Sequence, residues 1–179
     1  MKLNDKNVLI AYYSRRGNNY VNGSIQNLAV GNTEIIARKI QAITQGELFH
    51  IESVTGYPDG YKETTEVAKK EFRANVRPEL VQHLSGSEAY EVIFLGFPNW
   101  WGTMPMPVFT FLEEFDTSRK IIIPFCTHEG SGLGNSTRDI KKVCPKASVV
   151  NEIDFYGSRV NESNDAVKAW ITRIEKSLD

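Results

Sequence analysis

A segment rich in anion-binding groups follows the first apolar run of the sequence. It reads Ser14-Arg15-Arg16-Gly17-Asn18-Asn19 and supplies a hydroxyl, two guanidiniums, amide side chains and a glycine at which the backbone can approach a ligand. This chemistry suits a phosphate. Further on, Gly31-Asn32-Thr33-Glu34 predicts a helix start capped by Asn32 or Thr33, where free N–H groups and the helix dipole favour the same anion. A polar turn rich in helix-capping residues is an equally good interpretation of the first segment alone.

The glycine spacing excludes two common phosphate-binding motifs. The sequence contains no Gly-x-x-x-x-Gly-Lys-Ser/Thr, and it lacks the Gly-x-Gly-x-x-Gly pattern of dinucleotide folds. A mononucleotide therefore fits this segment better than the ligands of either motif. Residues 20–30, between the phosphate segment and the helix start, are long for a strand-to-helix connection, so we interpret them as a lid or a structural excursion.

Two adjacent tryptophans mark a second candidate segment, which reads Pro98-Asn99-Trp100-Trp101-Gly102 and follows another apolar run. Tryptophan is seldom placed on a solvated loop unless its ring packs against something. Neighbouring side chains tend to point to different sides, so we expect one indole to face inward and the other to face a ligand. The alternative is that both rings pack against the helix that starts near Pro107.

A glycine-rich segment is the third candidate. It reads Thr127-His128-Glu129-Gly130-Ser131-Gly132-Leu133-Gly134 and presents many backbone N–H and C=O groups, which can bind the edge of a planar heterocycle. His128 is the only histidine in the three segments, and it is either a donor to the ligand or an exposed loop histidine. For Glu129 we favour a solvated loop carboxylate over a ligand contact.

Alternating strands and helices are predicted to bring the three segments together. Continuous apolar runs predict strands at residues 8–13, 48–51, 90–97, 120–126 and 147–153. Periodicity and capping residues predict helices that start near residue 32 and at 61–73, 108–115, 135–143 and 164–177. This pattern predicts one domain over residues 1–179, a three-layer α/β/α sandwich with a five-stranded parallel sheet. In such sheets a ligand binds beyond the carboxyl ends of the strands, where all three segments fall.

Two of the predicted helices differ in their apolar content. Ile36, Ile40 and Ile43 lie on one face of the first helix, which predicts that this face packs on the sheet. Residues 61–73 carry only sparse apolar side chains, so we expect that helix to be exposed.

Composition and charge restrict the possible partners. Hydrophobic residues make up 41% and charged residues 24% of the 179 residues, which is typical of a folded globular protein. The net charge is -1 without a block of like charge, so nucleic acid is not an expected partner. No apolar run suits a signal peptide or a membrane span. Cys126 and Cys144 are too few for a disulfide framework, so we expect a cytoplasmic protein, and we expect no metal site.

Three other classes of protein lack their key residues here. A serine hydrolase needs Gly-x-Ser-x-Gly, but Glu129 stands two residues before Ser131. A small cysteine phosphatase needs an arginine six residues after Cys126, where Gly132 stands, so we interpret Cys126 as a buried strand thiol. A response regulator needs acidic residues at the ends of the first and third strands, where aromatic residues stand.

Taken together, the three segments resemble the flavodoxin-like family. The resemblance rests on Tyr13-Ser14-Arg15-Arg16-Gly17, Val30-Gly31-Asn32-Thr33, residues 98–102 and residues 127–134, and the element order matches from Asn7 to the last helix. It is strongest to a subgroup of bacterial flavodoxin-like proteins of this length, and it implies strand order 2-1-3-4-5 with FMN as cofactor. The family's phosphate loop runs straight into its helix, whereas here the loop is split between Asn19 and Gly31.

The resemblance also implies which residues bind the cofactor. The FMN phosphate would be surrounded by Ser14, Arg16, Gly17, Asn19, Asn32 and Thr33. The isoalloxazine would be flanked by Pro98, Asn99, Trp100, Trp101, Gly102, Thr127, His128, Glu129, Gly130, Ser131 and Gly132. One of the two tryptophans would stack on this ring. His128 would tune the flavin by donating to its pyrimidine edge, which favours the reduced anion.

A bound flavin would perform the redox chemistry, while the protein sets potential, access and partner. Electron-carrier flavodoxins are strongly acidic, whereas this chain is nearly neutral. We therefore favour an FMN-dependent oxidoreductase that accepts hydride from NAD(P)H and passes electrons to a small acceptor such as a quinone. The first alternative is a flavodoxin that carries single electrons between redox proteins, and the second is a non-catalytic FMN-binding protein. Because no separate nicotinamide motif occurs, NAD(P)H would have to reach an exposed face of the flavin transiently.

Overall fold

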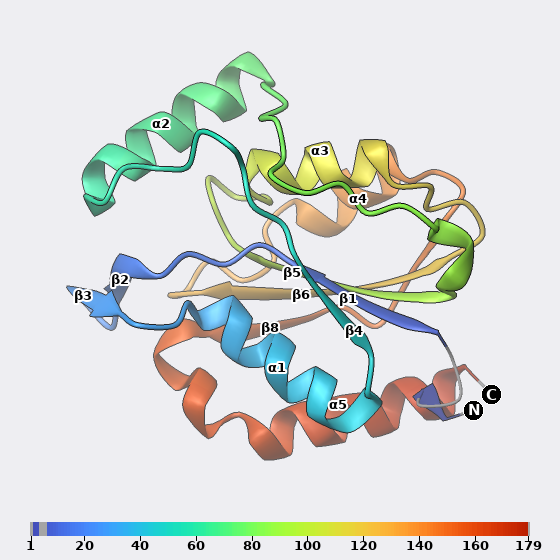
Figure 1. The fold of residues 1–179 in the computed structure, drawn as a ribbon. Helices are drawn as coiled ribbons and strands as arrows, with labels where there is room; N and C mark the ends of the chain where they lie inside the picture. The colour runs from blue at the N-terminus through green and yellow to red at the C-terminus, as the bar shows by residue number, and fades with distance from the viewer. Residues whose placement is uncertain (1, 4–6, 179) are drawn as a thin grey trace.

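The computed structural model describes residues 2–3 and 7–178. A parallel sheet runs through the centre, with helices on both of its faces (Figure 1). Its strands are β1 (Val8–Tyr12), β4 (Glu47–His50), β5 (Val92–Pro98), β6 (Ile121–His128), β7 (Ser148–Val149) and β8 (Ile153–Tyr156). The sheet order is β4-β1-β5-β6-β7, with β8 also paired to β6, which confirms the expected order 2-1-3-4-5.

The expected fifth strand is two short strands, so the sheet has six strands and not five. Residues 147–153 were predicted as one strand, but Asn151 has a left-handed backbone with φ 55°, which ends an extended segment between β7 and β8. The indole of Trp170 donates a hydrogen bond of 2.7 Å to the carbonyl of Asn151. This bond holds the segment between β7 and β8 against the last helix of the chain.

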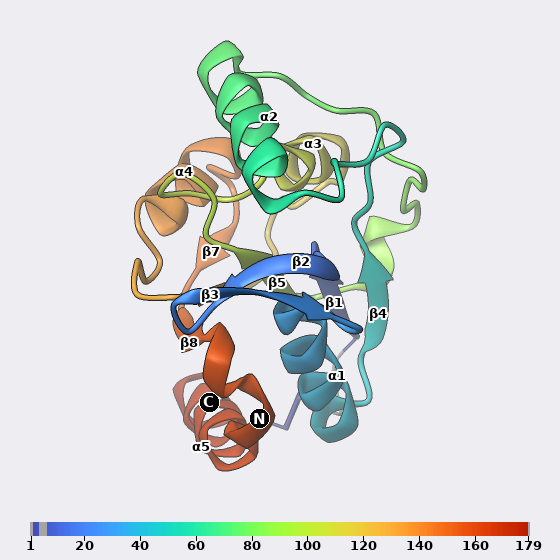
Figure 2. The same ribbon diagram turned by 90° about the vertical axis from the view of Figure 1, so that its left-hand side faces the viewer.

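In the described part of the chain, five α-helices surround the sheet, and they lie close to the predicted ranges. They are α1 (Asn32–Thr44), α2 (Tyr61–Ala74), α3 (Met106–Glu114), α4 (Ser136–Val143) and α5 (Asn164–Ser177), with short 3-10 helices η2 (Ser87–Ala89) and η3 (Gly157–Glu162). Helices α1 and α5 cover one face, while α2, α3 and α4 lie on the other side (Figures 1 and 2). No helix within residues 2–3 and 7–178 is long and apolar enough to cross a membrane.

The sheet separates two apolar cores, which explains why its strands read as continuous apolar runs. Leu9 and Ile93 pack with the residues of α3 and α4, whereas their neighbours Ile10 and Phe94 pack with those of α1 and α5. All four side chains are fully buried. Successive residues point to opposite faces, so a strand covered on both faces must be apolar throughout.

One expected core residue of α1 lies outside. Ile36 and Ile40 are buried as predicted, but Ile43 is 37% exposed. Thr44 takes the next inward position, and its hydroxyl donates to the carbonyl of Ile40 at 3.0 Å. The buried hydroxyl of Thr44 thus has a hydrogen-bond partner in the backbone of its own helix, and Thr44 packs on the sheet in place of Ile43.

The long connection after β1 is an antiparallel hairpin of β2 (Gly17–Val21) and β3 (Ser24–Leu28). Asn22 and Gly23 form the turn with φ 47° and 88°, the left-handed pair that suits a two-residue hairpin loop. The hairpin is separate from the main sheet and crosses in front of the carboxyl ends of its strands (Figure 2). The predicted lid or excursion is thus an ordered ribbon over the edge where ligands bind.

Candidate functional site

A cleft of about 520 Å³ opens at the carboxyl ends of β1, β5 and β6. All three candidate segments contribute to its lining. Of the predicted site residues, it contains Asn19, Asn32, Thr33, Pro98, Asn99, Trp100, Trp101, Thr127, His128, Glu129 and Ser131. They converge here because the chain reverses its winding direction between β1 and β5, which leaves a crevice at that edge.

Three predicted phosphate ligands lie outside the cleft lining. Ser14, Arg16 and Gly17 line a neighbouring hollow of about 760 Å³ at the ends of β1 and β4. Arg15, which was not predicted as a ligand, lines both spaces. The phosphate segment is therefore a wall between the two spaces. The structure brings its far end, Asn19, into the cleft, but it leaves the Arg16 side chain on the exposed side.

The amino end of α1 is capped by a side chain that lies 20 positions earlier in the sequence. The Oγ of Ser14 accepts a hydrogen bond of 3.0 Å from the N–H of Glu34, and Gly31 occupies the N-cap position. The interpretation of Asn32 or Thr33 as the cap is therefore wrong. With the capping done by Ser14, the side chains of Asn32 and Thr33 line the cleft instead.

Thr33 and Thr127 meet on the floor of the cleft. Their hydroxyl oxygens are 2.8 Å apart, and both residues are buried. Thr33 also belongs to the first turn of α1, where N–H groups and the helix dipole attract an anion. This end of the cleft therefore offers two hydroxyls, the Asn32 amide and the positive end of a helix.

Arg15 is held by neighbouring acceptors. Its guanidinium donates to the carbonyls of Pro58 and Asp59 at 2.8 and 3.1 Å and to the hydroxyl of Thr64 at 3.1 Å, with a further bond to the carbonyl of Asn18. These bonds join the phosphate segment to the start of α2. Arg15 therefore acts as a structural clamp.

Replacing Arg15 with methionine should lower the free energy of unfolding by about 2 kcal/mol, because several carbonyls lose a charged donor. Urea denaturation followed by circular dichroism measures this change. The matched control is Arg16→Met, since Arg16 is exposed and makes no hydrogen bond within the described residues. Equal losses in the two variants would show that Arg15 is no clamp.

The tryptophan segment forms a tight turn. Trp100 and Thr103 exchange backbone hydrogen bonds of 2.9 and 3.2 Å. Between them, Trp101 and Gly102 both have left-handed backbones, with φ 54° and 81°. This conformation is costly for a large side chain and suits glycine, which accounts for Gly102 without any contact to the cleft.

The two indoles of this turn take different positions. Trp100 packs edge-on against Tyr13 and Tyr57, with ring centroids 5.3 and 4.9 Å apart. Trp101 is 45% exposed, and its ring N–H donates to the carbonyl of Thr65 at 3.0 Å. One ring is thus inward and the other lies at the cleft mouth, as we expected for neighbouring residues.

Asn99 ties the second and third segments together. Its Nδ2 donates to the carbonyl of Gly132 at 2.7 Å, and its Oδ1 accepts from the N–H of Gly102 at 3.0 Å. Its backbone N–H donates to the carbonyl of Thr127 at 2.9 Å. Together with the bond of 2.7 Å from the N–H of Asn135 to the carbonyl of Gly102, these contacts fix the separation of the two loops.

His128 is buried at the end of β6, so the exposed-loop interpretation is wrong. Its Nδ1 accepts the N–H of Gly130 at 2.8 Å, and its Nε2 lies 2.9 Å from a carboxylate oxygen of Asp154. An accepting Nδ1 requires the tautomer with its proton on Nε2, which then donates to Asp154. Both ring nitrogens are engaged within the protein, so the ring lines the cleft while its Nδ1 holds the Gly130 peptide in one orientation.

Glu129 is a bridge and not the solvated carboxylate that we favoured. One of its oxygens accepts from the N–H of Ser158 at 2.7 Å, and the other accepts from the N–H of Asn22 at 3.0 Å. Ser158 is at the start of η3 and Asn22 is in the hairpin turn. The carboxylate thus joins the hairpin to the far side of the cleft.

Cys126 has no role as a nucleophile. Burial raises the pKa of its thiol, which is fully enclosed in β6. The sulfur lies 3.6 Å from the carbonyls of Thr127 and Gly132, as a weak donor would. The predicted buried strand thiol is confirmed.

One wall of the cleft was not predicted. It consists of Tyr20 from β2 and of the first turns of α2, where Tyr61, Thr65 and Ala68 face the cleft. Tyr20 and Tyr61 stack with ring centroids 6.2 Å apart. The helix is exposed overall, as predicted, and its sequence gives no signal for a cleft wall except the aromatic residue at its start.

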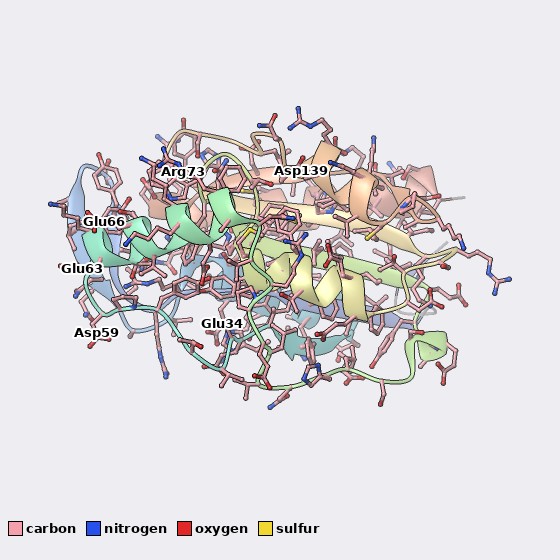
Figure 3. The ribbon with its side chains drawn as sticks, turned by 90° about the horizontal axis from the view of Figure 1, so that it is seen from above. Glu34, Asp59, Glu63, Glu66, Arg73 and Asp139 are labelled. Atoms are coloured by element: carbon pink, nitrogen blue, oxygen red, sulfur yellow. The ribbon has the colours of Figure 1, made fainter. Side chains whose placement is uncertain are left out.

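Acidic side chains gather outside this wall. Asp59, Glu63 and Glu66 lie at the start of α2, beside the hairpin (Figure 3). Within the described residues none of the three makes a side-chain ion pair. Lys62 and Lys69 belong to the same helix, and the Lys69 ammonium lies 4.6 Å from the centre of the Trp101 ring. Acidic and basic side chains therefore alternate on the surface next to the cleft.

The sequence matches a family model described as Flavodoxin over residues 7–174. The chain belongs to the flavodoxin family. The three segments on which the resemblance to this family rests all contribute to the one cleft. No curated protein matches this flavodoxin-family sequence.

Solved structures show the same fold. A structure described as a flavoprotein from Bacteroides uniformis has a TM-score of 0.71 at 23% identity, covering 93% of this chain and 98% of that one. One from Bacteroides eggerthii has a TM-score of 0.67 at 24% identity, covering 91% and 98%. A flavoprotein in complex with FMN from Lactobacillus acidophilus has a TM-score of 0.62 at 21% identity, covering 88% and 97%.

Proposed function

We propose that this protein is an FMN-dependent oxidoreductase that takes electrons from NAD(P)H and passes them to a small acceptor such as a quinone. The observation that carries the proposal is the aromatic mouth of the cleft. Trp101 lines the cleft at the end that would hold the isoalloxazine, and it remains 45% exposed. Such a mouth leaves room for a second planar molecule beside a bound flavin.

The donor set of the cleft fits FMN. At one end, Asn32, Thr33 and Asn19 surround the amino end of α1, which would hold the phosphate. At the other end, the tryptophan turn and the glycine-rich loop would hold the isoalloxazine between an indole and backbone groups. The cleft volume of about 520 Å³ is in the range of ordinary ligand sites.

Bound FMN would supply the capacity to accept a pair of electrons with a proton and to pass the electrons on. The residues of the chain would bind and orient the flavin and control access to it. Trp101 would cover part of one face of the ring. Asn99 would keep the two flanking loops at a fixed separation, and His128 would hold the Gly130 peptide in one orientation.

We expect two substitutions of His128 to separate its two hydrogen bonds. His128→Asn keeps an acceptor near the position of Nδ1 for Gly130, so FMN affinity should stay within about threefold of wild type. His128→Gln keeps only a donor toward Asp154, so affinity should fall about tenfold. Quenching of FMN fluorescence measures both dissociation constants. Equal affinities in the two variants would contradict the positioning role.

Gly157→Ala should raise the dissociation constant of FMN about tenfold. A Cβ at this buried position would fall 2.4 Å from Nδ2 of Asn32 and 2.7 Å from Oε1 of Glu129, so both side chains must shift. Calorimetric titration with FMN measures the change, with Ser158→Ala as control because it leaves the neighbouring backbone N–H in place. If Gly157→Ala binds FMN with wild-type affinity, Asn32 does not contribute to FMN binding.

A one-electron carrier is the second candidate function. It uses the same FMN site, and Asp59, Glu63 and Glu66 beside the cleft supply carboxylates for contacts with a basic redox partner, next to Lys62 and Lys69 of the same helix. A carrier would take electrons from that partner and not from a nucleotide.

An anaerobic titration distinguishes the two functions. FMN-loaded protein is mixed with NADPH and then with NADH, and the flavin absorbance is followed. Loss of the flavin absorbance within a few seconds, without a second protein, supports the oxidoreductase. Enzymes typically turn over at about one per second or faster, so direct reduction should be complete on this time scale. An oxidised spectrum that persists with both nucleotides, yet bleaches with dithionite, supports the carrier and contradicts our proposal.

A further inference from the structure

The β2–β3 hairpin contacts the rest of the molecule mainly through β2, where for example Nδ2 of Asn18 donates to the carbonyl of Asp59 at 3.2 Å. All residues of β3 except Leu28 are exposed, and its ladder bonds are made only with β2. Its two ends are fixed, because β2 starts in the phosphate segment and β3 leads to Gly31 at the start of α1. The exposed outer strand β3 is therefore held in place through β2 and through the contacts of the turn.

Glu129 holds the free end of this ribbon. The only described hydrogen bond that links the hairpin turn to another element runs from the N–H of Asn22 to Oε2 of Glu129. The other carboxylate oxygen is anchored by the N–H of Ser158, so the side chain is fixed in position on the opposite side of the cleft. Charged acceptors of backbone N–H groups are among the stronger hydrogen bonds.

The hairpin also touches the wall of the cleft along its length. Tyr20 stacks on Tyr61 of α2, and Val21 is only 7% exposed although the rest of the ribbon is largely solvated. Asn19 and Tyr20 line the cleft beside Asn32 and Thr33. The hairpin therefore lies over the end of the cleft that would hold the phosphate. The two ends of the hairpin, at the start of β2 and before Gly31, lie beside the same end of the cleft.

We propose that the hairpin is a flap, closed by Glu129, that retains FMN and excludes flavins extended beyond the phosphate. The inference rests on the proposed FMN site. FAD carries an AMP group on the phosphate, and this group must leave the cleft where the closed hairpin crosses it. FMN ends at the phosphate and fits beneath the flap.

Release of FMN tests the retention step. FMN-loaded protein is diluted, and the recovery of free FMN fluorescence gives the dissociation rate. Glu129→Ala removes both hydrogen bonds and should raise the rate about tenfold, while Glu129→Gln keeps one acceptor and should raise it about threefold. Glu152→Gln removes the same charge at an exposed residue that forms no hydrogen bond within the described chain, and should leave the rate unchanged.

Selectivity for FMN over FAD tests the flap itself. A shortened variant carries Asn-Gly in place of residues 20–25, between Asn19 and Gln26, which are paired in the ladder and so can close a two-residue turn. Wild type should bind FAD about 100-fold more weakly than FMN, and the shortened variant should lose most of this difference. Equal binding of the two flavins by wild type would overturn the proposal.

Hydrogen exchange of the protein without flavin gives an independent readout. The N–H groups of Asn22 and Ser158 should exchange faster in Glu129→Ala than in wild type, whereas amides of β5 should not change. Unchanged exchange at Asn22 would overturn the role of Glu129, whether or not the shortened variant folds.

If wild type binds no FMN, the proposed function fails. If wild type binds FMN and Glu129→Ala releases it at the wild-type rate, only the flap fails.

Discussion

Replacing Asn99 with aspartate is expected to weaken FMN binding about 100-fold. The substitution puts a carboxylate oxygen where Nδ2 now donates to the carbonyl of Gly132 at 2.7 Å, so two acceptors would face each other. Loss of a donor with partial burial of a charge costs about 2–3 kcal/mol, which corresponds to this change in affinity. Calorimetric titration with FMN measures the dissociation constant.

The side chain of Asn99 also accepts from Gly102, and aspartate preserves this second bond. Any loss in Asn99→Asp therefore reports on the bond to Gly132 and the spacing of the two loops. Asn99→Ser, a neutral truncation, serves as the comparison and should weaken binding about tenfold. Wild-type affinity in Asn99→Asp would mean that the loops do not flank the flavin.

The largest effect on stability is expected for Gly96→Ala, with a loss of about 3 kcal/mol in the free energy of unfolding. Gly96 lies in the middle of β5, and an added Cβ would be 2.1 Å from Cζ of Phe125 on the neighbouring strand β6. Phe125 is fully buried, so its ring has no free space to move into. Urea denaturation measures the loss.

A double-mutant cycle identifies the cause of that loss. Phe125→Leu alone should destabilise the protein by removing buried ring atoms, but it should restore part of the stability when combined with Gly96→Ala. Additive losses in the double variant would contradict a steric clash between the two positions.

Sheet order and helix positions could be predicted because burial on both faces leaves a direct trace in the sequence. Ile93, Phe94 and Leu95 form a continuous apolar run for that reason. The three loops were located by the same logic, since parallel strands place their carboxyl ends at one edge. Their residue types then indicated a phosphate and a planar ring.

The roles within the loops were harder to predict, because they depend on contacts between residues far apart in sequence. Ser14 caps a helix through the N–H of Glu34, 20 positions away, which left Asn32 and Thr33 free to face the cleft. His128 depends on Asp154, 26 positions away. No local pattern contains such pairings.

The hairpin shows a signal that was present but not used. Asn22-Gly23 is the pair most favoured in two-residue hairpin turns, and its flanking residues can pair across it. The polar composition of β3 hid the strand pattern, because almost all of its side chains are exposed and do not alternate.

Magnetic resonance of ¹⁵N-labelled protein titrated with FMN tests most directly whether the flavin occupies the cleft. We expect the amide signals of Thr33, Thr127 and Gly130 to shift on binding, since these residues line the cleft or are held beside it. Signals of Tyr12 and His50, which line the neighbouring hollow, should stay in place. Shifts centred on Tyr12 and His50 would contradict the site.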